Sequence, residues 1–188
     1  MDLPHKNAAY KLQDYWNERY TKEENFEWCK SYDDFKDLIH KHLRNSDKIL
    51  MLGCGNSALS EQMYKDGYRN IVNIDFSPVV IENMKRKYKH LVEMEWLVMD
   101  ITNLTFSPNS FEVVVEKATL DALMVEERDL WNPSQEVRDR MDSVLKQVSH
   151  TTHNFVLGNL CISQLGHSIF YPHLCLPNGK MNSFLGKD

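Results

Sequence analysis

The sequence lacks an excess of basic residues. Among its 188 residues, 22 are lysine or arginine and 27 are aspartate or glutamate, which gives a formal net charge of −5 at pH 7. Domains that bind nucleic acid through its phosphates normally carry a surplus of lysine and arginine. The charge balance therefore argues against direct binding of DNA or RNA, and we expect none.

Long apolar runs are also missing. No stretch reaches the roughly 20 apolar residues that cross a bilayer as a helix. Residues 1–20 carry acids early and have no apolar core of the kind that a secretory signal needs. The cysteines are widely spaced and form no Cys-x-x-Cys pair; they are Cys29, Cys54, Cys161 and Cys175. These absences predict reduced thiols and a cytoplasmic protein without membrane contact, which we expect to be a monomer.

Zinc-ligand spacing is absent as well. The only grouping worth testing is formed by His150, His153, Cys161 and Cys175, and its spacing matches no standard zinc pattern. No glycine-rich Walker turn occurs, and no local sequence indicates a serine, histidine and aspartate triad. We therefore expect no metal and no P-loop nucleotide site.

What the sequence does contain is an alternation of strand-like and helix-like segments. Short aliphatic runs predict buried strands at residues 48–53, 71–75, 94–100 and 111–117. Helices are predicted at residues 57–67, 77–88 and 134–149, after a helical and aromatic region at residues 8–45. Strands alternating with helices of this length predict an α/β fold with a parallel sheet.

A glycine turn, "LGCGNSA" at residues 52–58, joins the first predicted strand to the next helix. Gly53, Gly55 and Ala58 fit the spacing G-x-G-x-x-G/A, which permits close approach of the backbone to a nucleotide. Alone this signal is weak, since a plain strand–helix turn has the same appearance. It places a ligand at the carboxyl ends of the strands without separating a dehydrogenase from a methyltransferase.

Two acids near the ends of neighbouring strands sharpen the prediction. Asp75 closes the second strand, where a carboxylate can accept hydrogen bonds from two ribose hydroxyls, and Asp100 closes the third, where it can accept the exocyclic amine of adenine. A doubly acidic pocket suits an adenosine that carries a sulfonium and suits a pyrophosphate poorly. An NAD-dependent oxidoreductase is therefore the less favoured alternative. Either acid could instead be an ordinary helix cap or turn residue.

Several blocks carry a resemblance to a known family: "YWNERY", "LMLGCGNSALS", "VNIDFSPVVI", "MDITNLTF" and "VVVEKATLDAL". Together, from Tyr15 to Ser149, they resemble the seven-strand methyltransferases that use S-adenosylmethionine. More narrowly, they are similar to the lysine methyltransferases that modify translation elongation factor 1-alpha. The resemblance implies a Rossmann-like class I methyltransferase fold, S-adenosyl-L-methionine as cofactor, and elongation factor 1-alpha as protein substrate.

The same resemblance implies nine cofactor-binding residues: Trp16, Tyr20, Trp28, Gly53, Asp75, Phe76, Asp100, Ile101 and Lys117. The three aromatic residues of the N-terminal region would line the methionine end, and Lys117 would reach the cofactor from the end of the fourth strand. A sulfonium is a cation without hydrogen-bond donors, and aromatic faces attract such cations. Taken without the resemblance, Trp16 and Tyr20 are better interpreted as core anchors of a helix, because aromatic residues dominate protein cores.

No catalytic residue is assigned. The acceptor lysine must lose a proton, and a carboxylate at the mouth of the site could orient it and help to remove that proton. Glu116 and Asp121, both in "EKATLDAL", are the candidates, and each could equally be a cap or a surface acid.

The C-terminal part departs from the family. The family continues beyond a helix like residues 134–149 with a Gly-Gly turn and three more strands, in the order 3-2-1-4-5-7-6. Residues 150–188 have neither that turn nor strand alternation. We therefore expect a cofactor-binding domain at residues 1–149 with strand order 3-2-1-4, followed by an irregular apolar tail at residues 150–188. The alternative function is a catalytically impaired chain that only binds the cofactor or partners.

Overall fold

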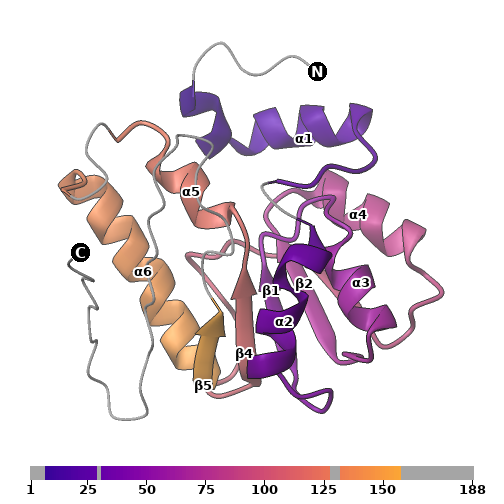
Figure 1. Ribbon diagram of the computed structural model, residues 1–188. Helices are drawn as coiled ribbons and strands as arrows, with labels where there is room; N and C mark the ends of the chain where they lie inside the picture. Colours follow the sequence, from indigo (N-terminus) through magenta and orange to yellow (C-terminus); the bar gives the residue numbers. More distant parts are fainter. Residues whose placement is uncertain (1–6, 29–30, 128–131, 158–188) are drawn as a thin grey trace.

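The computed structural model describes residues 7–28, 31–127 and 132–157 of the chain. At its centre is a parallel sheet with the strand order β3-β2-β1-β4-β5 (Figure 1). The strands are β1 (Ile49–Leu52), β2 (Ile71–Asp75), β3 (Glu95–Val98), β4 (Phe111–Glu116) and β5 (Thr152–Leu157). The predicted α/β fold and the predicted order of the first four strands are confirmed.

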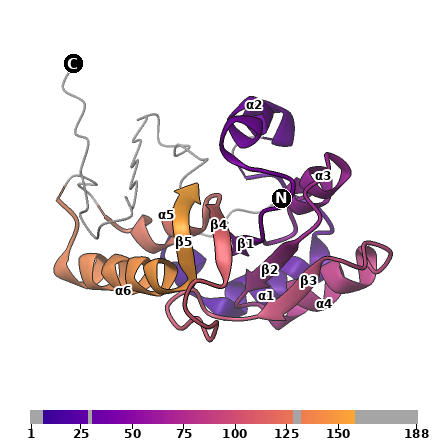
Figure 2. The ribbon, with the colours of Figure 1, turned by 90° about the horizontal axis from the view of Figure 1, so that it is seen from below.

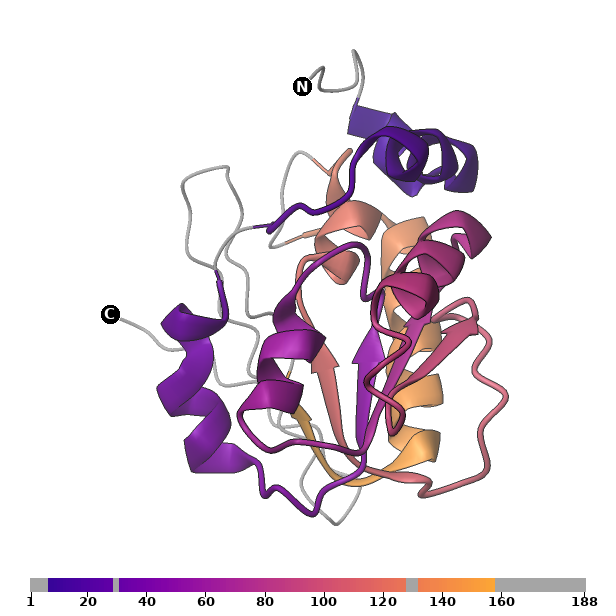
Figure 3. The same ribbon diagram turned by 90° about the vertical axis from the view of Figure 1, so that its right-hand side faces the viewer.

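Helices cover both faces of this sheet and the carboxyl ends of its strands. They are η1 (Asn7–Lys11), α1 (Gln13–Lys22), α2 (Tyr32–His42), α3 (Leu59–Lys65), α4 (Pro78–Lys87), α5 (Thr119–Met124) and α6 (Gln135–Thr151). Figure 3 shows α2 and α3 on one side of the strands and α6 on the other, and residues of α4 belong to the same core cluster as those of α2 and α3. In Figure 1, η1 and α1 lie across the top, above the carboxyl ends of the strands.

The aliphatic run of β1 fills both layers of the core. Ile49 and Met51 belong to the cluster shared with α2, α3 and α4, whereas Leu50 and Leu52 belong to the cluster shared with α6. All four side chains are buried. Burial on both faces is why a central parallel strand is a continuous apolar run rather than an alternating one.

Two of the predicted helices begin at a serine that caps their first turn. Ser77 caps α4 by accepting a hydrogen bond from the backbone N–H of Val80, and Pro78 occupies the first helical position. Ser134 caps α6 in the same way through the N–H of Val137. The helical region predicted at residues 8–45 contains three helices, η1, α1 and α2, and residues 23–28 after α1 are irregular.

The prediction that the sheet stops at the fourth strand is wrong. Strand β5 pairs with β4 in parallel, with Phe111 opposite Thr152 and Val113 opposite Phe155, and a β-bulge lies between these two pairs. Figure 2 shows β5 beside β4, with the end of α6 next to the start of β5. Helix α6 passes directly into this strand at Thr152, whose backbone is already extended and whose Oγ donates to the carbonyl of Phe111 at 3.1 Å.

The predicted irregular tail is therefore contradicted over residues 150–157, and the rest of it, residues 158–188, lies outside the described residues. Helix α5 was not predicted either. Its six residues are too few for a helical period to stand out. Within the described part of the chain, no helix is long and apolar enough to cross a membrane.

Candidate functional site

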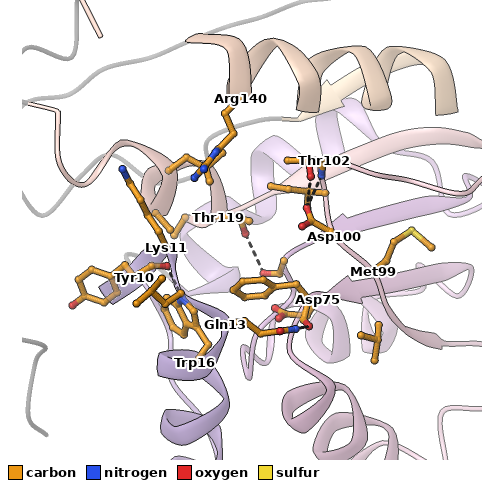
Figure 4. Close-up of a pocket in the computed structure, with 18 of the residues that line it drawn as sticks. Tyr10, Lys11, Gln13, Trp16, Asp75, Met99, Asp100, Thr102, Thr119 and Arg140 are labelled. Carbon is orange, nitrogen blue, oxygen red and sulfur yellow. Dashed lines mark hydrogen bonds between the residues drawn. The ribbon is translucent and has the colours of Figure 1, made fainter. Parts of the chain in front are cut away.

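A cavity of about 670 Å³ lies at the carboxyl ends of the strands, between the sheet and the N-terminal helices (Figure 4). Eight of the nine predicted cofactor-binding residues line it: Trp16, Tyr20, Gly53, Asp75, Phe76, Asp100, Ile101 and Lys117. The ninth, Trp28, is not part of the lining. Residues that lie up to 101 positions apart in the sequence are thus brought to one place.

The position directly after β1, residue 53, leaves room only for a glycine. Its backbone has φ of +58°, and a Cβ atom there would lie 2.2 Å from Oγ1 of Thr119. That hydroxyl donates to the carbonyls of Leu52 and Gly53, both at 3.1 Å, and so fixes the start of α5 against the glycine turn. A side chain at position 53 would both strain the backbone and push this contact apart.

Asp75, at the end of β2, is held in a fixed orientation by two backbone N–H groups. Its Oδ2 accepts from Gly55 at 3.0 Å and its Oδ1 accepts from Ser77 at 2.9 Å. Burial raises the pKa of Asp75 to about 6, although both hydrogen bonds act to lower it. Each carboxylate oxygen has a second lone pair, so the group can still accept two hydroxyl donors from a ligand in the cavity.

Asp100 differs from Asp75 in its exposure. It lies two residues beyond the end of β3 and is exposed. Its Oδ1 accepts from the backbone N–H of Thr102 at 2.8 Å and from the hydroxyl of the same residue at 2.7 Å. Among the described residues, Oδ2 has no hydrogen-bond partner and is available to a donor in the cavity. Oδ1 of Asp100 therefore acts as in an ordinary turn residue, whereas Oδ2 remains for a ligand.

Aromatic side chains from the N-terminal segment form the opposite wall. The rings of Trp16 and Tyr20 stack at 5.6 Å between centroids, one helical turn apart on α1. Nε1 of Trp16 donates to the carbonyl of Tyr10 at 2.7 Å, and Trp28 meets the Trp16 ring edge-on at 5.9 Å. Trp28 thus buttresses the wall from outside, whereas the resemblance implied that it lines the ligand.

Tyr20 has a second role beside its ring. Its side chain is buried, and its hydroxyl approaches the glycine turn so closely that a Cβ at Gly55 would lie 3.1 Å from it. Burial is the main cause that raises the pKa of Tyr20 well above its usual value, followed by the charge of Asp75. The phenol is therefore neutral in the folded protein. Sequence analysis assigned Tyr20 either to the ligand or to the core and missed this contact with the turn.

Lys117, directly after β4, is buried and forms an ion pair that sequence analysis also missed. Its Nζ donates to Oε2 of Glu27 at 2.7 Å and to the carbonyl of Trp28 at 3.1 Å. Glu27 lies 90 positions earlier, and nothing in the local sequence distinguishes it from its acidic neighbours. In isolation, Lys117 looks like an ordinary solvated lysine; the structure shows it instead as part of the cavity wall.

The two candidate acids of "EKATLDAL" have different environments. Glu116 is buried, and its Oε1 accepts from the N–H groups of Thr119 and Leu120 at 2.6 and 2.9 Å, so it caps α5. Between them, Ala118 adopts a left-handed backbone with φ of +64° and lines the cavity. Asp121 does not line the cavity, and burial, followed by the charge of Glu116, raises the pKa of its carboxyl to about 7.

Two cations lie at the far side of the cavity. Lys11 of η1 and Arg140 of α6 both line it, and Figure 4 shows Lys11 to the left of Thr119 and Arg140 above it. Lys11 pairs with Glu126 at 2.8 Å, and Arg140 lies 3.6 Å from Glu136. Neither residue was predicted from the sequence. No cluster of potential metal ligands occurs within the described ranges.

The donor and acceptor pattern fits an adenosine ligand that carries a cation. One cavity contains a buried carboxylate, a carboxylate oxygen without a partner among the described residues, two stacked aromatic rings and a glycine turn that lets a ligand approach the backbone closely. Its size exceeds that of an adenosine alone and falls in the usual range for small-molecule sites.

Comparisons with known proteins agree with this geometry. Residues 49–146 match a protein family described as "Methyltransferase domain". The chain is 41% identical over 151 residues to proteins of Mus musculus and Bos taurus named "EEF1A lysine methyltransferase 4"; the match covers 79% of this chain and 59% of each relative. A Drosophila melanogaster "eEF1A lysine and N-terminal methyltransferase homolog" is 41% identical over 81% of this chain and 22% of its own length.

Among solved structures, a methyltransferase of Aquifex aeolicus, described as dependent on S-adenosylmethionine, superposes with a TM-score of 0.53. The two chains are 12% identical, and the match covers 74% of this chain and 70% of the other. A protein of Pyrococcus horikoshii superposes with a TM-score of 0.51 at 21% identity, over 64% of this chain and 50% of the other. At these identities the similarity shows the fold alone.

Proposed function

The chain belongs to the methyltransferase domain family, with S-adenosylmethionine as cofactor, and on that premise we propose that it methylates a lysine of elongation factor 1-alpha. The named relatives that support this substrate are longer: the chain spans 59% of the mammalian ones. The observation that carries the proposal is the meeting of Asp75, Asp100 and the stacked Trp16 and Tyr20 in one cavity.

The proposed placement of the cofactor follows the two acids. The ribose hydroxyls donate to Asp75, which two backbone N–H groups already hold in orientation. The adenine amine donates to the open oxygen of Asp100, and Phe76 and Ile101 border the ring. Trp16, Tyr20 and Lys117, which line the cavity beyond Gly53, would hold the methionine end.

When bound, the cofactor supplies a methyl group on a sulfonium, which is already a strong electrophile. The chain therefore has to position, desolvate and orient. The faces of Trp16 and Tyr20 attract the sulfonium and exclude water from it. Thr119 holds the start of α5 against the glycine turn, so this part of the cavity wall is fixed.

The acceptor must arrive as a neutral amine. We propose no general base, because Asp121, whose carboxyl has a pKa raised to about 7 by burial, does not line the cavity. Glu116 is excluded from this role, since it already caps α5. Location in the cytoplasm and a monomeric state complete the proposal.

Methyl transfer itself tests the proposed function. Purified protein is incubated with S-adenosylmethionine and unmodified elongation factor 1-alpha, and lysine methylation is mapped by peptide mass spectrometry. We expect one lysine to gain methyl groups, and none with the Asp75→Ala variant. Cofactor binding without methylation of elongation factor 1-alpha would overturn the proposed substrate. It would favour the alternative function, a chain that only binds the cofactor or partners.

A further inference from the structure

The Glu27 carboxylate joins three segments that are far apart in the sequence. Its Oε2 lies 2.7 Å from Nζ of Lys117 and 2.8 Å from Oγ of Ser57. Its Oε1 accepts from the backbone N–H of Ala58 at 2.5 Å. A carboxylate with an ion pair, a hydroxyl donor and a backbone donor is held in one orientation. Glu27 is thus a fixed negative charge behind the cavity wall.

The donors around Glu27 are those that many α/β folds use for a phosphate. A backbone N–H and a hydroxyl just after a glycine turn, together with a nearby lysine, are the usual partners of a nucleotide phosphate in such folds. Here Ala58, Ser57 and Lys117 supply these groups, and the chain's own carboxylate occupies them. Lys117 also lines the cavity, so its charge is balanced by Glu27 at the boundary of the ligand site.

We propose that Glu27 is a specificity-determining residue that makes the cavity accept an adenosine without phosphates and reject one that carries them. A phosphate extending from the ribose past Gly53 would find the donors of Ala58, Ser57 and Lys117 already engaged by Glu27, whose carboxylate lies behind the cavity wall. Like charges at such a partly buried place repel each other strongly. This inference rests on the proposed function for the adenosine-binding role of the cavity, and it explains the choice between a sulfonium cofactor and a dinucleotide.

The same carboxylate also fastens the N-terminal segment, so the test must separate charge from attachment. Glu27→Gln has nearly the same shape and keeps an oxygen that can accept from Ala58, but it removes the negative charge. Glu24→Gln is the matched control, because Glu24 is exposed and lies three positions earlier on the same segment. Hydrogen exchange of residues 20–28 in the absence of ligand reports attachment independently of any activity.

The experiment is a calorimetric titration of each variant with adenosine and with ADP. The wild-type chain and Glu24→Gln are expected to bind adenosine much more tightly than ADP. In Glu27→Gln the ratio of the two dissociation constants is expected to fall by about tenfold or more, because the repulsion of the phosphates is removed. A change in that ratio is an effect that a purely structural role would not produce.

Three results overturn the inference. One is an unchanged ratio in Glu27→Gln. Another is an equal loss of affinity for adenosine and ADP, together with faster hydrogen exchange in residues 20–28. That result would mean that Glu27 only attaches the N-terminal segment to the rest of the protein. The third is a wild-type chain that binds ADP as well as adenosine. If that chain still binds S-adenosylmethionine, the proposed function stands and only the role of Glu27 falls; if it does not, the proposed function has failed separately.

Discussion

The two walls of the cavity are built in different ways. The sheet wall consists of the glycine turn and the ends of β2 and β3. Backbone groups orient its side chains, as the N–H groups of Gly55 and Ser77 do for Asp75. The N-terminal wall consists of residues 7–28, and it is held by side-chain contacts over long sequence separations. Asn17 accepts from Ser77 at 2.6 Å, and Glu27 binds Lys117 across 90 positions.

This difference has a physical consequence. Backbone contacts within the core open only when the sheet itself unfolds, whereas a segment attached by partly exposed polar contacts opens at a lower free energy. A ligand that must enter between the walls can use the N-terminal wall as the part that yields. The sheet wall then supplies most of the fixed geometry and the N-terminal wall supplies closure.

The largest effect is expected from Gly53→Ala in the sheet wall. The added Cβ would overlap Thr119, and the residue would keep a φ of +58° that disfavours side chains. We expect S-adenosylhomocysteine binding to be lost and the free energy of unfolding to fall by about 1–3 kcal/mol. Calorimetry and denaturant unfolding measure the two effects.

Gly67→Ala is the control for that variant. Gly67 has φ of +107°, and its Cβ would meet the side-chain amide of Asn45, outside the cavity lining. It should lose stability and keep cofactor affinity. Equal loss of affinity in both variants would mean that the glycine turn acts only through the stability of the fold.

The next effect belongs to Asp75. Asp75→Ala leaves the N–H groups of Gly55 and Ser77 without their acceptor and removes the proposed ribose contact. We expect cofactor binding to weaken by about 1–3 kcal/mol, the scale of an unpaired buried polar group. The exposed acid Asp37 on α2 serves as control, and Asp37→Ala should bind like the wild type. Unchanged affinity in both Asp75→Ala and Asp100→Ala would remove the assignment of the two acids.

A smaller effect is expected in the N-terminal wall. Trp16→Ala removes one of the two stacked rings that we propose to contact the sulfonium, and it should weaken S-adenosylmethionine binding by about 1 kcal/mol. The neutral product S-adenosylhomocysteine should be affected less, since it lacks the cation. Trp96, stacked on Tyr88 in the core, is the control: Trp96→Ala should destabilise the fold without distinguishing the two ligands. Equal weakening for both ligands in Trp16→Ala would make the aromatic wall a packing feature only.

The smallest effect concerns pH and Asp121. Its folded pKa of about 7 lies above the usual value of 3.8, so the folded state keeps a proton that the unfolded state releases. The free energy of unfolding therefore falls as pH rises from about 4 to 7, and the full penalty is present above pH 7. Asp121→Asn should remove this penalty and raise stability at pH 8 by about 1 kcal/mol, with no change at pH 3. Denaturant unfolding of both proteins at pH 3 and pH 8 measures this gain. If the free energy of unfolding changed between the two pH values by the same amount in Asp121→Asn as in the wild type, the raised pKa would be contradicted.

The comparison also explains which parts could be predicted from the sequence. The sheet wall follows from local patterns: an aliphatic run, a glycine turn and an acid at a strand end locate Gly53 and Asp75 without any knowledge of the fold. Glu27 could not be found in this way, because its partners Ala58 and Lys117 become neighbours only after folding.

The missed elements have local reasons. Helix α5 follows the left-handed Ala118 and is only six residues long, so no period marks it. Strand β5 begins at Thr152 with no glycine or proline between it and α6, and the polar residues at its start conceal a strand. The prediction of a sheet that ends at β4 failed because it relied on a turn signal that this helix–strand junction does not use.

The most direct test of the account is a titration of the wild-type chain with S-adenosylhomocysteine and, in parallel, with NADH. The account predicts saturable binding of S-adenosylhomocysteine with one site per chain, protection of Gly53 and Asp75 amides from hydrogen exchange in the complex, and no heat with NADH. Saturable binding of NADH with no binding of S-adenosylhomocysteine would contradict the account and would indicate that the cavity binds a dinucleotide.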